Sequence, residues 1–318
     1  MALSTKVLRN RISSIKNTQK ITKAMELVAA SKMRKAVNNV LKSRTYSDLA
    51  WEMIQRLNTA TDPSLHKLLQ TKDKVSNVLV ILLTSNRGLC GGYNAQIINK
   101  TLQSISLHKD VAKTDIIIVG KKGRDMAYKF KQNILADFDK EDVINQVNEI
   151  FPLSRLVLSE YLKGNYDKVL ISYTDFISSL VQKPRVRQIL PITEKDDYIG
   201  EIYSQPLTAD FPTKTESAHI PDTASKKSEQ PNHNEYIFEP SPDKVLSDLL
   251  PRLIEVQIYQ AYLEANASEH SARMLAMRNA SDAAGDMIHD LKLTFNQARQ
   301  AGITQEIAEI SAGKAVIE

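Results

Sequence analysis

Cysteine and proline are scarce in this 318-residue chain, and neither is spread evenly along it. The single cysteine, Cys90, has no second thiol to pair with, which excludes an internal disulfide and suits a reducing compartment. No proline occurs before Pro63 or after Pro251, so both ends of the chain lack the strongest helix breaker. These two stretches therefore favour long, uninterrupted helices.

Long hydrophobic runs are also missing. The first strand-like segment has an apolar run of only residues 78–83, whereas a membrane-spanning helix needs about 20 apolar residues. We therefore expect no direct membrane span. The N-terminus is basic but lacks the apolar stretch of a signal peptide, so we expect it to belong to the mature fold.

Acidic side chains are nearly absent from the first 44 residues, which contain eleven lysines and arginines but only one acid, Glu26. This segment carries a formal charge of +10 while the whole chain carries +5, so the remainder is acidic. A solvated helix face can carry such a run of charge. The run also fits docking onto something acidic, such as a nucleic-acid backbone, an anionic lipid or an acidic protein loop. A basic coiled-coil protein that binds nucleic acid is therefore one alternative function.

Apolar and small residues recur in steps of three and four in both proline-free stretches. In the first stretch, the repeating positions are Ile21, Met25, Val28, Met33, Val37 and Val40. In the second, they continue over several heptads: Ala267, His270, Met274, Met277, Ser281, Ala284, Ile288, Leu291, Phe295, Ala298 and Gly302. This heptad spacing is typical of a coiled-coil stripe. We expect His270, which lies on that stripe, to be a packed residue rather than a metal ligand.

The length of these helices determines how they can be arranged. A helix of about 60 residues would be about 90 Å long, whereas a compact chain of this size has a diameter of about 50 Å. Both terminal helices must therefore project from the fold, and each offers an apolar stripe that needs a partner. Their pairing with each other predicts an antiparallel rod, and a parallel dimer made by either helix alone is the alternative.

The middle of the chain has a different pattern, because continuous apolar runs alternate with helical segments. Residues 78–84, 116–119 and 168–173 predict strands buried on both faces, as in a parallel sheet covered by helices. A last strand is expected at residues 186–190. The expected helices span residues 95–107, 124–131, 142–150 and 153–162. This alternation predicts an α/β domain with right-handed crossovers.

Motifs that carry chemistry are scarce. The glycine-rich loop at residues 85–94 follows a strand but lacks the Gly-Lys-Ser/Thr ending of a phosphate-binding P-loop. Residues 120–123 lack this ending too, and both segments fit tight turns better than nucleotide-binding sites. No histidine neighbours Cys90, and the six histidines show no metal-ligand spacing. We therefore expect no catalytic residue, no metal and no cofactor; a nucleotide-dependent enzyme that uses residues 88–92 is the second alternative.

Four segments carry a specific resemblance to a known family. Residues 15–34, 87–92, 268–274 and 298–306 resemble, in the same order, motifs of the gamma subunit of F-type ATP synthases. Two departures from the family pattern occur: Asn86 stands where Asp is usual, and Lys314 stands where Ala is usual. The resemblance implies a rotor shaft without a catalytic site of its own, which couples ion flow to ATP synthesis or hydrolysis.

The resemblance also implies partners, which are the alpha, beta and epsilon subunits and the membrane c-ring, at the cytoplasmic face of a bacterial inner membrane. The residues expected to contact the alpha/beta hexamer are Lys20, Lys23, Met25, Arg273, Arg299, Gln300, Thr304 and Glu309, with Met25 opposed to the last four. Tyr236, Phe238 and Glu239 are expected to contact the c-ring and epsilon. Residues 236–240 also fit the approach to a helix that starts near Pro242 and Asp243.

The expected fold class is therefore α/β: a long antiparallel coiled coil of the terminal helices, plus a central Rossmann-like α/β domain with a mainly parallel sheet. The expected division is an N-terminal shaft helix at residues 1–62 and the α/β domain at 72–192. A polar loop and foot segment at 193–240 and a C-terminal shaft helix at 241–318 complete it.

Overall fold

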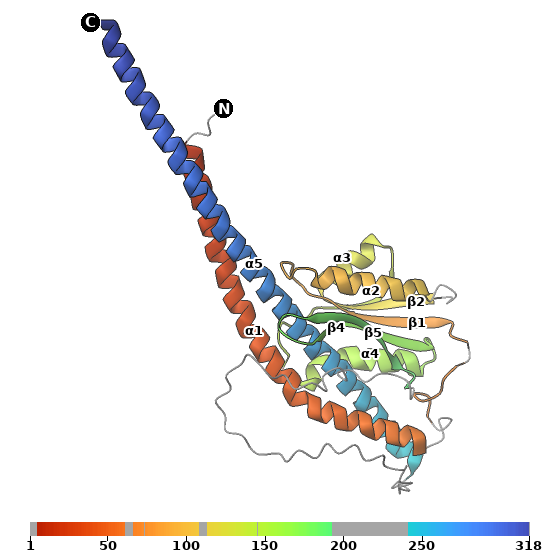
Figure 1. The fold of residues 1–318 in the computed structure, drawn as a ribbon. Helices are drawn as coiled ribbons and strands as arrows, with labels where there is room; N and C mark the ends of the chain where they lie inside the picture. Colours follow the sequence, from red (N-terminus) through yellow and green to blue (C-terminus); the bar gives the residue numbers. More distant parts are fainter. Residues whose placement is uncertain are drawn as a thin grey trace, which may run out of the picture.

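Two long helices form a rod that projects from a smaller α/β domain (Figure 1). The computed structural model describes residues 5–60, 66–72, 74–107, 113–144, 146–192 and 241–317. Helix α1 (Thr5–Ala60) has 56 residues and helix α5 (Pro242–Ile317) has 76, which correspond to about 84 and 114 Å. They pack side by side and antiparallel, so that the C-terminal end of α5 extends past the start of α1. The predicted antiparallel rod is confirmed.

The stripe predicted on α5 faces α1. Met277, Ser281, Ala284 and Ile288 are buried, and the stripe positions from residue 291 to residue 298 are half-buried. Gly302 is exposed, because it lies in the part of α5 that extends past the start of α1. The Gln19 Nε2 donates a hydrogen bond to the main-chain oxygen of Ser281 at 3.3 Å, which sets the register of the two helices.

The stripe predicted on α1 is partly wrong. Ile21 and Val28 are 61% and 58% exposed, so neither is buried in the seam with α5. A series of buried and half-buried positions runs along α1 in heptad steps and mixes small and polar residues with large apolar ones: Ile12, Ile15, Gln19, Thr22, Ala29, Met33, Ala36 and Val40. Close packing of two helices favours such small side chains at the contact. Apolar character with the right spacing was therefore an incomplete guide to the seam: Met33 and Val40 are buried, but Ile21 and Val28 are not.

A five-stranded sheet forms the centre of the α/β domain. Its strands are β1 (Asn77–Leu83), β2 (Lys113–Val119), β3 (Asn133–Phe138), β4 (Lys168–Phe176) and β5 (Gln182–Leu190). They lie in the order β3-β2-β1-β4-β5, with β1 to β4 parallel and β5 antiparallel to β4. The predicted α/β class with a mainly parallel sheet is confirmed.

The two faces of the sheet bury different helices. On one face, Leu79 and Ile81 of β1 join a core with α1, α5 and α4 (Phe151–Leu162). On the other face, Val80 and Leu82 pack towards α2 (Tyr93–Leu107) and α3 (Lys121–Lys129). Alternate residues of a strand point to opposite faces, which explains the continuous apolar run of β1.

Two expectations for the α/β domain are wrong. Strand β3 was not predicted, because its residues alternate between exposed and half-buried and so form no continuous apolar run. The helix expected at residues 142–150 is reduced to a short 3₁₀ turn, η2 (Val147–Ile150). The main chain before that turn bonds to the long helices instead: Asn39 of α1 donates to the Ile144 oxygen at 2.9 Å.

The seam makes a testable prediction. In a Cys90→Ser background, Gln19→Cys combined with Ser281→Cys should give a crosslink within a single chain, because these residues touch across the two helices. A short thiol-specific crosslinker and gel electrophoresis measure the yield. Ile21→Cys with Ser281→Cys is the matched control, since Ile21 is 61% exposed and so is not buried in the seam. Equal yields from both pairs, or crosslinks only between chains, would contradict this register.

Candidate functional site

Helix α5 crosses the carboxyl ends of the parallel strands. The Ser268 hydroxyl donates to the main-chain oxygen of Thr174, at the end of β4, at 2.9 Å. The Tyr93 hydroxyl, at the start of α2, donates to the Ala265 oxygen at 3.1 Å. In open α/β sheets, ligands normally bind at this edge. Here the shaft helix occupies it, with all of residues 266–271 buried.

The glycine-rich loop after β1 docks onto this helix. Gly91 has φ +57°, a left-handed conformation that glycine adopts without strain, and the loop turns there into α2. The Asn94 side chain accepts the Ser85 main-chain N–H at 3.0 Å and so closes the loop internally. Arg273 of α5 donates to the main-chain oxygens of Arg87 and Gly88 at 3.2 and 3.5 Å. The expected tight turn is present, and it serves as a contact to the shaft.

The second glycine-containing turn, at residues 120–123, is closely surrounded by neighbouring atoms of the chain. Gly120 has φ +104°, and a Cβ there would lie 2.5 Å from the main-chain oxygen of Thr84. The first N–H groups of α3, which a phosphate would need, are already bonded within the protein. Lys121 N–H donates to Asn86 Oδ1 at 3.2 Å, and Gly123 N–H donates to Thr84 Oγ1 at 2.9 Å.

A buried ion cluster joins α5 to the segment after β3. Lys140 Nζ lies 2.8 Å from Glu269 Oε2, and these side chains are only 2% and 6% exposed. Arg273 binds the other carboxylate oxygen at 2.9 Å. Burial raises the pKa of Glu269, but the charges of Lys140 and Arg273 outweigh it and hold the pKa below its ordinary value. The carboxylate is therefore ionised at neutral pH, inside the joint between shaft and domain.

His270 and Asp142 extend this cluster to α1. The main-chain oxygen of Asp142 lies 2.8 Å from His270 Nε2, so this nitrogen must carry the proton. The other ring nitrogen faces Arg273 at 3.5 Å and accepts from it. Burial lowers the pKa of His270, which keeps the ring neutral at pH 7. The Asp142 carboxylate pairs with Lys32 of α1, whose hydrogen bond lowers the pKa of that carboxyl.

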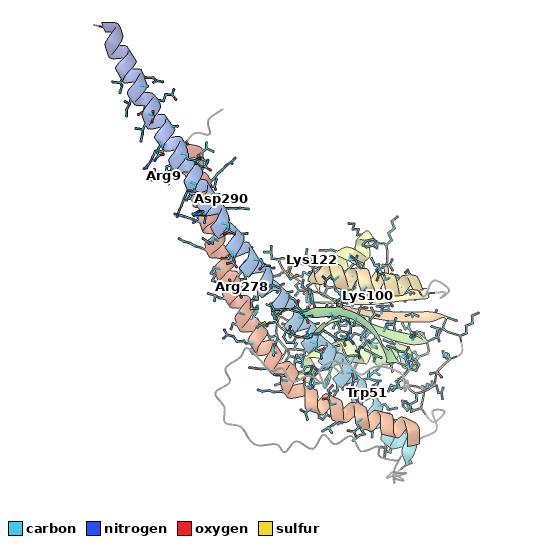
Figure 2. All side chains as sticks on the ribbon, in the orientation of Figure 1. Arg9, Trp51, Lys100, Lys122, Arg278 and Asp290 are labelled. Carbon is cyan, nitrogen blue, oxygen red and sulfur yellow. The ribbon has the colours of Figure 1, made fainter. Side chains whose placement is uncertain are left out.

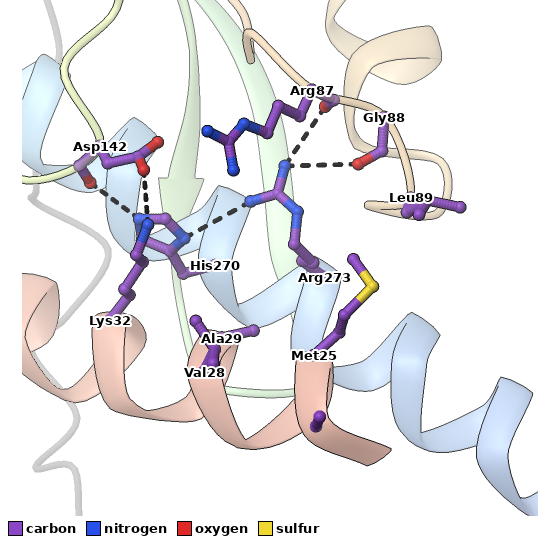
Figure 3. Close-up of a pocket in the computed structure, with 11 residues that line it drawn as sticks. Met25, Val28, Ala29, Lys32, Arg87, Gly88, Leu89, Asp142, His270 and Arg273 are labelled. Atoms are coloured by element: carbon purple, nitrogen blue, oxygen red, sulfur yellow. Dashed lines mark hydrogen bonds and ion pairs between the residues drawn. The ribbon is translucent and has the colours of Figure 1, made fainter. Parts of the chain in front are cut away.

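A pocket of about 340 Å³ opens between α1, α5 and the loop after β1 (Figure 3). Its apolar side comes mainly from α1 and Leu89, and its polar side from the cluster just described. The lining residues are Ala24, Met25, Val28, Ala29, Lys32, Arg87, Gly88, Leu89, Asp142, His270 and Arg273.

The residues expected to contact the hexamer fall into two groups. Met25 and Arg273 line this pocket, while Lys20 and Lys23 lie exposed on α1, Lys23 in an ion pair with Glu26 at 2.9 Å. The second group is exposed near the end of α5 and consists of Arg299, Gln300, Thr304 and Glu309. Tyr236, Phe238 and Glu239 lie outside the described residues.

Met25 does not oppose the residues near the end of α5, so that expectation is wrong. Met25 lies beside Arg273 in the pocket, and Arg299 follows Arg273 by about 39 Å along α5. The Gln19–Ser281 hydrogen bond fixes this offset. Near the tip, Thr304 donates to the Gln300 oxygen at 2.9 Å, and Ile303 and Ile307 are 49% and 59% exposed.

Comparisons with known proteins show which family the chain belongs to. Residues 4–317 match the sequence model of the ATP synthase family. The ATP synthase gamma chain of Roseiflexus sp. (strain RS-1) is 37% identical over 316 residues, covering 99% of this chain and 98% of the relative. That of Coxiella burnetii (strain CbuG_Q212) is 38% identical over 314 residues and covers 98% of each. The chain belongs to the ATP synthase gamma-chain family.

Solved structures of this family share the fold at lower identity. A chain of the Euglena gracilis mitochondrial ATP synthase (OSCP/F1/c-ring, rotational state 3) matches with a TM-score of 0.61 and 20% identity. The match covers 98% of this chain and 94% of that one. A chain of the Tetrahymena thermophila mitochondrial ATP synthase (central stalk/c-ring) gives a TM-score of 0.58 at 20% identity, covering 82% and 99%.

Several members of the joint were not singled out from the sequence. Lys140, Asp142 and Glu269 are such residues, and each contacts a partner more than a hundred positions away. The one available signal was the polar run 268–271, which includes His270 at a stripe position. His270 was expected to be a packed residue, and this is confirmed by its 2% exposure.

A second buried polar group lies beside β4 and β5. Glu264 of α5 is fully buried, receives a hydrogen bond from Gln260 at 3.1 Å and lies near Asp175, which pairs with Arg185. Burial, reinforced by the charge of Asp175, raises the pKa of Glu264 to about 8. Glu264 is therefore mainly protonated at pH 7 in the folded chain.

The ion cluster predicts the effect of removing its lysine. Lys140→Met leaves the Glu269 carboxylate buried with Arg273 as its remaining partner. We expect the free energy of unfolding to fall by about 3 kcal/mol, at the low end for a broken buried pair because Arg273 stays. Urea unfolding measures this change. Lys100→Met, at an exposed lysine labelled in Figure 2, should cost little, and equal losses in both variants would contradict the role of the pair.

The raised pKa of Glu264 predicts how stability depends on pH. Between about pH 4.5 and 8 the folded chain binds a proton that the unfolded chain has released, so this group lowers stability as pH rises. Glu264→Gln should therefore gain stability relative to the parent by at most about 1.4 kcal/mol per pH unit in this range. Urea unfolding at pH 5, 6, 7 and 8 tests this, with Glu306→Gln, at an exposed position, as the control. A constant difference across the range would be incompatible with this pKa.

Proposed function

We propose that this chain is the central rotor shaft of an ATP synthase, which turns within the catalytic hexamer and couples ion flow to ATP synthesis or hydrolysis. The observation that carries the proposal is the joint between shaft and domain. Helix α5 runs across the sheet edge and then continues, paired with α1, far beyond the domain (Figure 1). A twist applied to the α/β domain would therefore be carried directly into the coiled coil.

The buried ion cluster suits this mechanical role. Lys140, Glu269 and Arg273 are paired within 2.9 Å in a water-poor interior, where breaking a pair is costly. The loop after β1 adds main-chain acceptors for Arg273, and Asp142 adds a link to α1. Shaft and domain are thereby held together at several points around α5, as a rotor that transmits torque requires.

The proposed partners follow the length of the rod. The alpha and beta subunits would surround the paired part of α1 and α5 and its tip, with the basic face around Lys20 and Lys23 meeting an acidic loop of a beta subunit. Arg299, Gln300, Thr304 and Glu309 would form the second contact to the hexamer. Epsilon and the c-ring would bind at the opposite end, where Tyr236, Phe238 and Glu239 are the proposed contacts.

The nucleotide chemistry would occur in the beta subunits, and we propose no catalytic residue, cofactor or metal for this chain. The full-length likeness to ATP synthase gamma chains favours the rotor over a nucleic-acid-binding coiled coil. No helix in the described part of the chain is long and apolar enough to span a membrane. We place the chain peripherally, at the cytoplasmic face of a bacterial inner membrane. We also propose the division into four parts given above: residues 1–62, 72–192, 193–240 and 241–318.

The hexamer contacts are tested on membranes that carry the whole complex. Met25→Lys adds a cation beside Lys23 and Lys32 and should hold an acidic beta loop too tightly, so proton pumping should fall relative to ATP hydrolysis. Met25→Leu keeps the apolar side chain and should preserve the ratio. Arg299→Ala should lower turnover more than assembly, because a charge-assisted hydrogen bond of about 1.5–3 kcal/mol is lost in one rotary state.

Pumping and hydrolysis are measured on the same membranes. If Met25→Lys and Arg299→Ala both leave the pumping ratio and the turnover unchanged, these contact assignments are wrong. The foot is tested in the same preparation by replacing Tyr236 and Glu239 with Ala, which should release the assembled ATPase from the membrane sector. If the chain does not co-purify with alpha, beta and c subunits at all, the rotor proposal itself fails.

A further inference from the structure

The pocket beside the shaft combines an apolar wall with a surplus of positive charge. Its lining includes Lys32, Arg87 and Arg273 but only one acid, Asp142. The neutral ring of His270 adds no charge, because burial lowers its pKa. With Glu269 and Lys140, which join the lining through Arg273, four cations are gathered around two carboxylates. The electrostatic potential inside the pocket therefore favours an anion.

Two of the three cations are already engaged. Lys32 is paired with Asp142, and Arg273 binds Glu269 and the loop main chain. Among the described residues, no hydrogen bond or ion pair holds the guanidinium of Arg87, which is exposed. Figure 3 shows this side chain extending along the polar side of the pocket. Arg87 therefore retains all its donors for an incoming group, and its planar fork suits a carboxylate or sulfonate.

The opposite side of the pocket offers contacts to an apolar body. Leu89 is 62% and Val28 58% exposed, and Met25 and Ala24 also line the pocket. The volume of about 340 Å³ lies at the lower end of the range for small-molecule sites, about 300–1,000 Å³. An apolar lining with a few convergent polar groups is the usual make-up of such sites.

We propose that this pocket binds a small amphipathic anion, with its acidic group on Arg87 and its apolar body against Met25, Val28 and Leu89. Such a ligand would touch α1, α5 and the loop after β1 at once, and would therefore strengthen the joint between shaft and domain. Met25 and Arg273 are also proposed hexamer contacts, but binding of such a ligand to the folded chain alone does not depend on that proposal.

A set of ligands with one apolar body and three charges tests the site. Titration calorimetry on the full chain would compare naphthalene-1-sulfonate with the neutral 1-naphthylmethanol and the cationic 1-naphthylmethylammonium. We expect the sulfonate to bind at one site per chain and more tightly than both others. Arg87→Ala should weaken its binding roughly tenfold, and Leu89→Ala should weaken the sulfonate and the alcohol alike.

The control and the contrary outcomes are equally specific. Arg278→Ala removes another exposed arginine of the rod, labelled in Figure 2, and should leave the affinity unchanged. Arg87→Lys should restore part of the binding that Arg87→Ala loses, because it keeps the charge but not the fork. The proposal is overturned if no stoichiometric binding appears below about 1 mM. It is also overturned if the three ligands bind equally, or if Arg278→Ala weakens the sulfonate as much as Arg87→Ala.

Discussion

The crossing of α5 over the carboxyl edge of the sheet is the constraint on which the rest of the molecule depends. That edge exposes main-chain groups, and α5 satisfies two of them through Ser268 and Ser271, which donate to the oxygens of Thr174 and Ser179. In return, the Tyr93 hydroxyl of α2 donates to the Ala265 oxygen of α5. Because the same helix continues as the longer half of the coiled coil, one element belongs to both the domain and the shaft. The edge that other α/β proteins use for ligands is used here for a mechanical attachment.

The chemistry of the joint explains how a helix can be polar and buried at once. Residues 268–271 of α5 would be costly to bury without partners. Each charge is matched, since Glu269 meets Lys140 and Arg273, and His270 meets the Asp142 main chain. A fully paired polar cluster is more directional than an apolar contact, so it fixes the rotation of α5 about its own axis. An apolar seam alone would allow the helix to slide or turn more easily.

The shaft itself changes character along its length. Near the domain, α5 is covered by α1 and by the sheet, whereas residues 301–310 are all exposed. Exposed isoleucines at 303, 307 and 310 on a single helix are unusual for an isolated chain, and they suit a sleeve of other subunits. The change from a covered base to exposed turns at residues 301–310 fits the proposed insertion of the rotor into a hexamer.

The sequence by itself determined the antiparallel rod, the α/β class and the family. Proline-free ends with heptad steps, continuous apolar runs and long motifs are local signals, and they can be identified without knowing the fold. The tertiary structure alone decided which face of α1 meets α5, because Ile21 and Val28 satisfy the same spacing as the residues actually buried. It also decided the pairing of Lys140 with Glu269, 129 positions apart. Contacts between distant segments depend on how whole elements pack, and no local pattern encodes that packing.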